Sequence, residues 1–253
     1  MNNSKISRRS LIVNGSGLAA AGVVLAACST PDPGLARIGD APTTTALPDA
    51  KVSDVVLLRT LQSVENLAVD ALTDAGIAGK ADAKTKAALA GYVQGHKSNI
   101  ARLDQLVVAR GGESVTEANP KLAANYVEKA KELIADSDEP ETDVLSFVSE
   151  LEAMVAGSYQ AFVAWTNEPA LRSQMMSLAL DPSQFSAATA QMIRGGSKGI
   201  VPTKDDNGAE LVATIPSAFG PLSAFTATLG KPNEAGVKAT LNLETPSLNS
   251  LEY

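Results

Sequence analysis

The chain has 253 residues, with 28 acidic and 21 basic side chains and a formal net charge of −7. An acidic surface repels nucleic acid, so we expect no nucleic-acid partner. A single cysteine excludes an internal disulfide, so a packed hydrophobic core must stabilise the fold, and the length suffices for one such domain.

Residues 1–27 have the three parts of a secretory signal peptide, which are a basic segment, an apolar stretch and a small-residue cleavage site. Lys5, Arg8 and Arg9 precede the apolar stretch 11–27. That stretch is shorter than the about 20 apolar residues that a membrane-spanning helix needs. The sequence SRRSLI at residues 7–12 resembles the twin-arginine export motif, so we expect an exported protein.

The sequence LAAC at residues 25–28 resembles the lipobox of bacterial lipoproteins. The resemblance implies cleavage before Cys28 and attachment of lipid to its sulfur, which would anchor the protein to a membrane of the periplasm or cell envelope. An ordinary signal peptide with an incidental cysteine is the alternative. Because Cys28 is the only cysteine, a lone free thiol would otherwise be left in an exported protein, which favours lipidation.

Residues 28–50 contain four prolines and no hydrophobic periodicity, which predicts a lipid-attached flexible tether. Residues 1–27 hold three basic residues and no acidic residue. The chain that follows them therefore has 18 basic and 28 acidic residues, a formal net charge of −10.

The first long helix is predicted over residues 54–75 and the second over residues 82–110. The apolar stripe of the first consists of Leu58, Leu61, Val69 and Leu72, and Glu65 lies on the same stripe. Asp82 is the expected N-cap of the second helix. His96, the only histidine, lies on its apolar face between Val93 and Ile100.

A third long helix, residues 145–165, follows a shorter accessory helix predicted over residues 119–135. Its stripe consists of Val148, Val155, Tyr159 and Phe162, and Glu152 lies on it. A carboxylate on a buried stripe needs a partner, a proton or a metal, because an unpaired buried charge costs several kcal/mol. Glu150 points elsewhere on this helix, and we expect it to be solvated.

A fourth helix is predicted from residue 169 to the glycines at 195–196. Asp181 lies on its apolar stripe, three residues after Leu178. Because Pro182 follows, we expect a kink or restart there with Asp181 as the N-cap. Beyond residue 200 the pattern changes to β-branched residues and alternation. Residues 223–229 and 237–243 predict a β-hairpin that docks on the helices.

Four long helices with short connections predict a mainly α fold, a four-helix bundle with an accessory helix and a C-terminal hairpin and extended tail. We expect the bundle over residues 51–199 and the hairpin and tail over residues 200–253. Each long helix carries one side chain able to bind a metal, namely Glu65, His96, Glu152 and Asp181. Carboxylates and one imidazole converging in a bundle core are typical of a carboxylate-bridged metal site.

Residues 52–200 resemble the exported ferritin-like domain proteins, which include the desiccation-related type. Glu65 matches the family's first-helix Glu, and Glu152 with Tyr159 matches its third-helix pattern. The family also carries Glu-x-x-His on its second and fourth helices. Here His96 is present but Val93 stands at the Glu position. On the fourth helix Asp181 replaces the Glu and Gln184 the His.

The resemblance implies a metal centre that has lost ligands, since a di-iron site in this fold needs about six protein ligands and at most four remain. One hypothesis is a degenerate centre in a structural or interaction protein, with no catalytic or cofactor-binding residue assigned. A second is a metalloprotein with one Fe, Mn or Zn ion, or a reduced di-iron oxidoreductase handling iron or reactive oxygen. A solute-binding lipoprotein is a third. We favour the first.

Overall fold

The computed structural model describes residues 52–194, 203–204, 207–211 and 225–253. The predicted signal peptide, Cys28 and the tether lie outside these residues. So does the β-branched segment 212–215. Within the described residues the fold is mainly helical with small antiparallel two-stranded sheets, which confirms the mainly α prediction. No helix of this part of the chain is long and apolar enough to cross a membrane.

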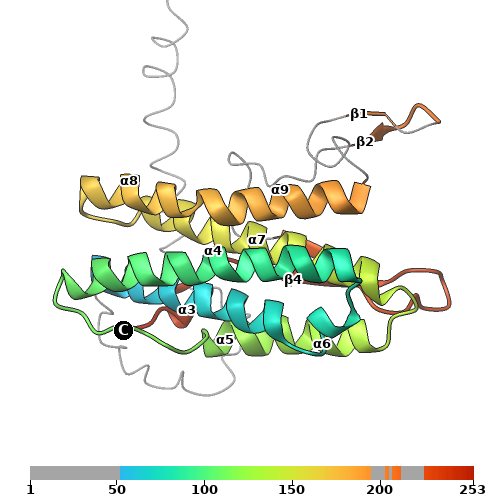
Figure 1. Cartoon of the computed structure of the whole chain (residues 1–253), viewed down its shortest axis with the longest axis horizontal. Coiled ribbons are helices and arrows are strands. Elements are labelled where there is room, and N and C mark those ends of the chain that lie inside the picture. Colours follow the sequence, from blue (N-terminus) through green and yellow to red (C-terminus); the bar gives the residue numbers. More distant parts are fainter. Residues whose placement is uncertain (1–51, 195–202, 205–206, 212–224) are drawn as a thin grey trace, which may run out of the picture. The chain divides into compact units, whose positions relative to one another are not determined.

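The long helices lie alongside one another (Figure 1) and contact each other in the order α4, α3, α7 and α9, with a further contact between α4 and α9. They are α3 (Asp54–Thr73), α4 (Ala83–Val108), α7 (Pro140–Val163), α8 (Pro169–Leu178) and α9 (Leu180–Arg194). Ser53 caps α3 and the predicted N-cap Asp82 caps α4, each accepting a backbone N–H of the first turn.

The helix break between α8 and α9 lies at Ala179, slightly before the predicted position. Pro182 has no N–H, so it cannot donate to the carbonyl of Leu178 four residues earlier. Asp181 lies within the first turn of α9 and is not its N-cap, which corrects the prediction. Pro182 is accommodated near the start of α9, where its missing N–H costs least.

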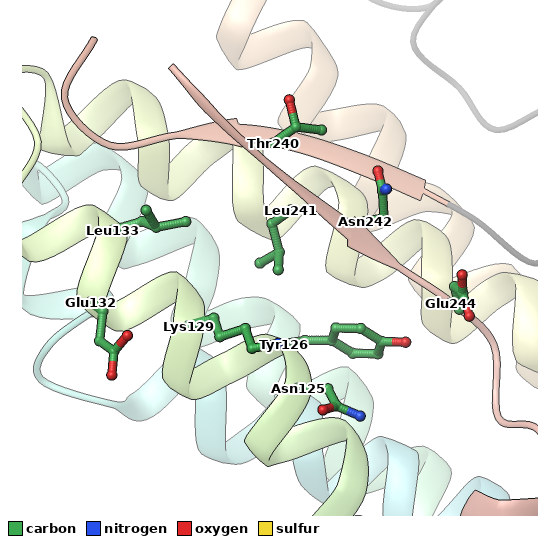
Figure 2. Close-up of a pocket in the computed structure, with 9 residues that line it drawn as sticks. All are labelled: Asn125, Tyr126, Lys129, Glu132, Leu133, Thr240, Leu241, Asn242 and Glu244. Atoms are coloured by element: carbon green, nitrogen blue, oxygen red, sulfur yellow. The ribbon is translucent and has the colours of Figure 1, made fainter. Parts of the chain in front are cut away.

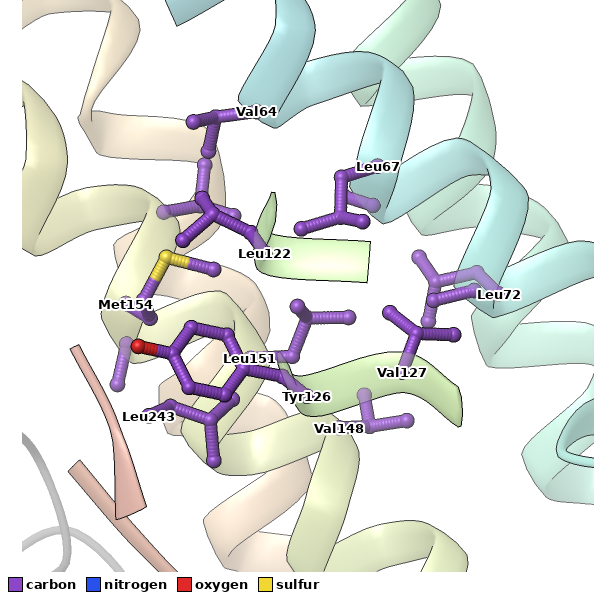
Figure 3. Close-up of a cluster of buried hydrophobic side chains, with 14 of the residues drawn as sticks. Val64, Leu67, Leu72, Leu122, Tyr126, Val127, Val148, Leu151, Met154 and Leu243 are labelled. Carbon is purple, nitrogen blue, oxygen red and sulfur yellow. The ribbon is translucent and has the colours of Figure 1, made fainter. Parts of the chain in front are cut away.

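The accessory helix has three parts, α5 (Pro120–Leu122), the π-helical turn η2 (Ala123–Val127) and α6 (Glu128–Ala135). Its buried residues pack on α3, α7 and the C-terminal sheet (Figure 3). There the ring of Tyr126 lies near Met154 and Leu243. Leu122 and Val127 complete this part of the hydrophobic core.

The predicted C-terminal hairpin is confirmed as β3 (Phe225–Leu229) paired with β4 (Ala239–Leu243), with Phe225 opposite Leu243. A second small sheet pairs β1 (Thr203–Lys204) with β2 (Glu210–Leu211). The hairpin docks on α7 through Asp143, which is buried. Its carboxylate accepts the N–H of Gly230 at 2.7 Å and an Nζ–H of Lys238 at 2.8 Å.

Candidate functional site

Glu65, His96 and Glu152 meet in the interior, where all three have no exposed surface. Nδ1 of His96 lies 2.5 Å from Oε2 of Glu65, and its Nε2 lies 3.0 Å from Oε1 of Glu152. Three helices, α3, α4 and α7, therefore place one polar side chain each at a single point. Spacing on the apolar stripes predicted this convergence, and the distances confirm it.

Glu65 is the most completely bonded member of this cluster. Besides His96, it accepts the hydroxyl of Tyr159 at 2.5 Å and an N–H of Asn99 at 3.1 Å. Three donors from three different residues therefore meet at this one carboxylate. Burial, and then the neighbouring Glu65 carboxylate, raise the pKa of Tyr159 well above 10.0, so Tyr159 remains a neutral hydrogen-bond donor.

Asn99 is a member of the cluster that the sequence reasoning missed. Its Nδ2 donates both to Glu65 and to the carbonyl of Leu178, at 3.2 Å. That carbonyl is the one that Pro182 leaves without a helical donor. Asn99 therefore connects the α8–α9 break to the cluster. The signal was present in the sequence, since Asn99 follows His96 by three residues and so lies on the same helical face.

Asp181 does not join the cluster. It is half-buried, and among the described residues it makes no hydrogen bond or ion pair with Glu65, His96 or Glu152. Its link to the site is electrostatic, through a minor effect on Tyr159. Gln184, where the resemblance expects a fourth-helix histidine, is exposed. The fourth helix therefore contributes a backbone carbonyl to the cluster and no carboxylate.

Opposing effects set the charge of His96. Burial lowers its pKa, but the carboxylates of Glu152 and Glu65 outweigh burial and hold the pKa well above 6.5. Burial raises the pKa of Glu152, and the charge of His96 opposes that rise. Two carboxylates around one imidazolium leave an excess negative charge. The negative charge on Glu152 is poorly stabilised by hydrogen bonds, because its Oε2 has no partner among the described residues.

A phenylalanine closes the cluster on the side of α9. The ring of Phe185 meets the ring of His96 edge-on at 5.6 Å and stacks on Tyr92 at 4.4 Å. Gly95 makes this approach possible, since a Cβ at that position would lie 2.4 Å from Cζ of Phe185. Packing against α9 therefore requires a residue without a Cβ at position 95, next to His96.

The residues present do not fit a metal ion bound by Glu65, His96 and Glu152. The two ring nitrogens of an imidazole point in divergent directions, and here each faces a different carboxylate. One ion at either nitrogen would leave the opposite carboxylate beyond reach, because metal–ligand bonds are about 2 Å long. Within the described residues no group of three or more His, Cys, Asp or Glu side chains is arranged to hold a metal ion.

Glu150 is half-buried, whereas we expected it to be solvated. β3 lies against α7, and the backbone N–H of Thr226 opposes the effect of burial on the pKa of Glu150. Burial raises the pKa of Glu150 to about 7. Helix periodicity placed Glu150 off the main stripe correctly but contained no information on the hairpin that covers it.

Comparisons of the chain with protein-family models, with curated proteins and with solved structures found no match.

Proposed function

We propose that this chain is an exported, lipid-anchored protein of the bacterial envelope with a ferritin-like four-helix bundle formed by α3, α4, α7 and α8–α9. In this proposal the metal centre is degenerate and the remaining polar residues have a structural role. The protein acts as a structural or interaction component and not as an oxidoreductase. The observation that carries the proposal is the direct bonding of both His96 ring nitrogens to carboxylates.

The geometry supports a role in fixing how the helices align. Glu65, His96 and Glu152 come from three helices, and Asn99 adds the carbonyl of Leu178 on the fourth. Sliding any of these helices by one residue would separate a buried donor from its acceptor, at a cost of about 1–3 kcal/mol for each group left unpaired. A polar cluster of this kind selects one helix register over the alternatives that an apolar core would tolerate.

Metal content distinguishes this role from a metalloprotein. The full-length chain would be incubated with Fe, Mn or Zn, desalted, and measured by elemental analysis beside the Glu65→Ala/Glu152→Ala variant. We expect no stoichiometric metal in either protein. One bound ion per chain that disappears in the variant would overturn the proposal and favour the metal-binding or di-iron alternative.

The lipid anchor rests on the sequence around Cys28. The wild-type chain and Cys28→Ser would be expressed in a bacterial host and partitioned between detergent and aqueous phases. We expect the wild type in the detergent phase and the variant in the aqueous phase. A variant that partitions like the wild type would refute the anchor while leaving the role of the buried cluster untouched.

A further inference from the structure

The two edges of the C-terminal hairpin differ. The backbone N–H of Gly230, the residue after β3, bonds to Asp143 of α7 at 2.7 Å, so it points away from β4. By the alternation of an antiparallel pair, the N–H of Thr226 points the same way. Thr226 is opposite Asn242 in the register, so these two residues form a non-hydrogen-bonded pair. The ladder bonds between β3 and β4 must then come from the alternate pairs, such as Ala227 with Leu241.

The same alternation directs the N–H and C=O groups of Thr240 and Asn242 away from β3. Among the described residues, no group pairs with the outward backbone groups of Thr240 and Asn242. The outer edge of β4 is therefore open where the edge of β3 is covered.

A groove of about 610 Å³ runs along this open edge, with η2 and α6 as its other wall (Figure 2). Tyr126, Leu133 and Leu241 give it an apolar part, and Leu241 points toward the helices. The open edge runs from Thr240 to Asn242, a span of about 7 Å at the rise of a β-strand. A short extended segment can therefore bond to the edge while placing alternate side chains over the apolar residues.

The charged residues of the groove favour a basic occupant. Glu132 and Glu244 lie on opposite walls, with Lys129 as the single cation among the lining residues. The nearby Lys131 is already paired with Asp74 at 3.1 Å and with Glu128 at 3.3 Å. A basic segment would gain charge complementarity at both walls, whereas an acidic one would be repelled.

We propose that this groove binds a short, extended, basic segment of a partner protein, which pairs with Thr240 and Asn242 as an additional strand beside β4. Strand addition draws its affinity from main-chain hydrogen bonds and its specificity from alternate side chains. The groove is separate from the buried Glu65–His96–Glu152 cluster. The inference therefore does not depend on the proposed function.

The test uses a fluorescein-labelled octapeptide of alternating valine and lysine, titrated with the full-length chain at low salt and followed by fluorescence anisotropy. We expect saturable binding that is lost when alternate peptide nitrogens are methylated or when glutamate replaces lysine. Asn242→Pro removes one outward N–H without removing a ladder bond to β3, so it should weaken binding about tenfold or more. Asn242→Val keeps that N–H and should bind within twofold of wild type.

Charge is tested separately, which also covers the case in which Asn242→Pro fails to fold. Glu132→Lys should weaken binding about fivefold, whereas Glu234→Lys, the same charge change at the exposed hairpin turn, should not. Absence of saturable binding at millimolar peptide would overturn the proposal, as would equal binding of the methylated peptide. Sedimentation of the chain alone gives the remaining outcome. A dimer that Asn242→Pro dissociates would assign the edge to a second copy and would also overturn the proposal.

Discussion

Replacing Glu65 with leucine should destabilise the fold by about 4 kcal/mol, as expected for breaking a buried ion pair. Leucine has a similar size, so the change acts mainly through lost hydrogen bonds. His96, Asn99 and Tyr159 would each lose an acceptor in a fully buried site. Urea unfolding followed by circular dichroism gives the free energy of unfolding as the product of midpoint and slope.

The double variant Glu65→Leu/His96→Leu separates this explanation from general core damage. Each single variant leaves one member of the Glu65–His96 pair buried without the other. The double variant removes both members, although Glu152, Asn99 and Tyr159 still lose a partner. We therefore expect the double variant to cost clearly less than the about 8 kcal/mol that additivity gives, because groups in contact couple. Glu128→Leu, which removes an exposed i,i+3 ion pair with Lys131, serves as the surface control and should leave the midpoint almost unchanged. Additive costs, or a Glu65→Leu cost below about 1 kcal/mol, would refute the reasoning.

Four further variants test other contacts. The pKa of Glu150 is raised from 4.5 to about 7, so its contribution to stability is complete below pH 4.5 and is lost as the pH rises through about 7. Glu150→Gln should remove that loss, at most about 3 kcal/mol, when unfolding is measured from pH 4.5 to pH 7.5. Gly95→Ala should cost about 1–3 kcal/mol because its Cβ overlaps Phe185. Gly91→Ala on the same helix, where a Cβ meets nothing within 4 Å, should instead stabilise by about 0.5–1 kcal/mol. Asp143→Ala should release the hairpin, seen as faster amide hydrogen exchange over residues 225–243 than over α3.

Each of these predictions would be contradicted by a specific result. A Glu150→Gln profile parallel to that of the wild type would mean that Glu150 is not buried by the hairpin. Equal effects of alanine at positions 91 and 95 would remove the packing argument for Gly95. Unchanged exchange over residues 225–243 in Asp143→Ala would show that the apolar face of the hairpin alone holds it on α7.

The parts of the site that could be predicted are those that helix periodicity controls. Glu65, His96 and Glu152 each interrupt an apolar stripe, and residues on stripes face a common core, so their meeting followed from spacing alone. The hairpin followed from alternation and a long turn. The N-cap of α4 followed from Asp82, a residue type whose side chain accepts a free N–H of the first turn.

What could not be predicted depends on contacts between elements distant in the sequence. Asp181 fits the stripe of its helix, but the proline beside it moved the break to Ala179 and left Asp181 outside the cluster. The second contact of Asn99, with the carbonyl of Leu178, exists because that same proline frees this carbonyl. Glu150 is half-buried under a strand about 75 residues away in sequence, a contact that no local pattern specifies.

The central claim concerns His96, and because it is the only histidine its imidazole can be observed without assignment of other signals. We would record ¹H–¹⁵N spectra of the full-length chain labelled with ¹⁵N-histidine across pH 5 to pH 9, with and without added Zn or Mn. The pKa of His96 lies well above 6.5, so its stabilising contribution is complete below pH 6.5 and is lost only as the pH rises through that raised pKa. The account predicts two protonated ring nitrogens at neutral pH that metal does not perturb. A nitrogen that loses its proton near pH 6.5, or one that shifts stoichiometrically on addition of metal, would contradict it.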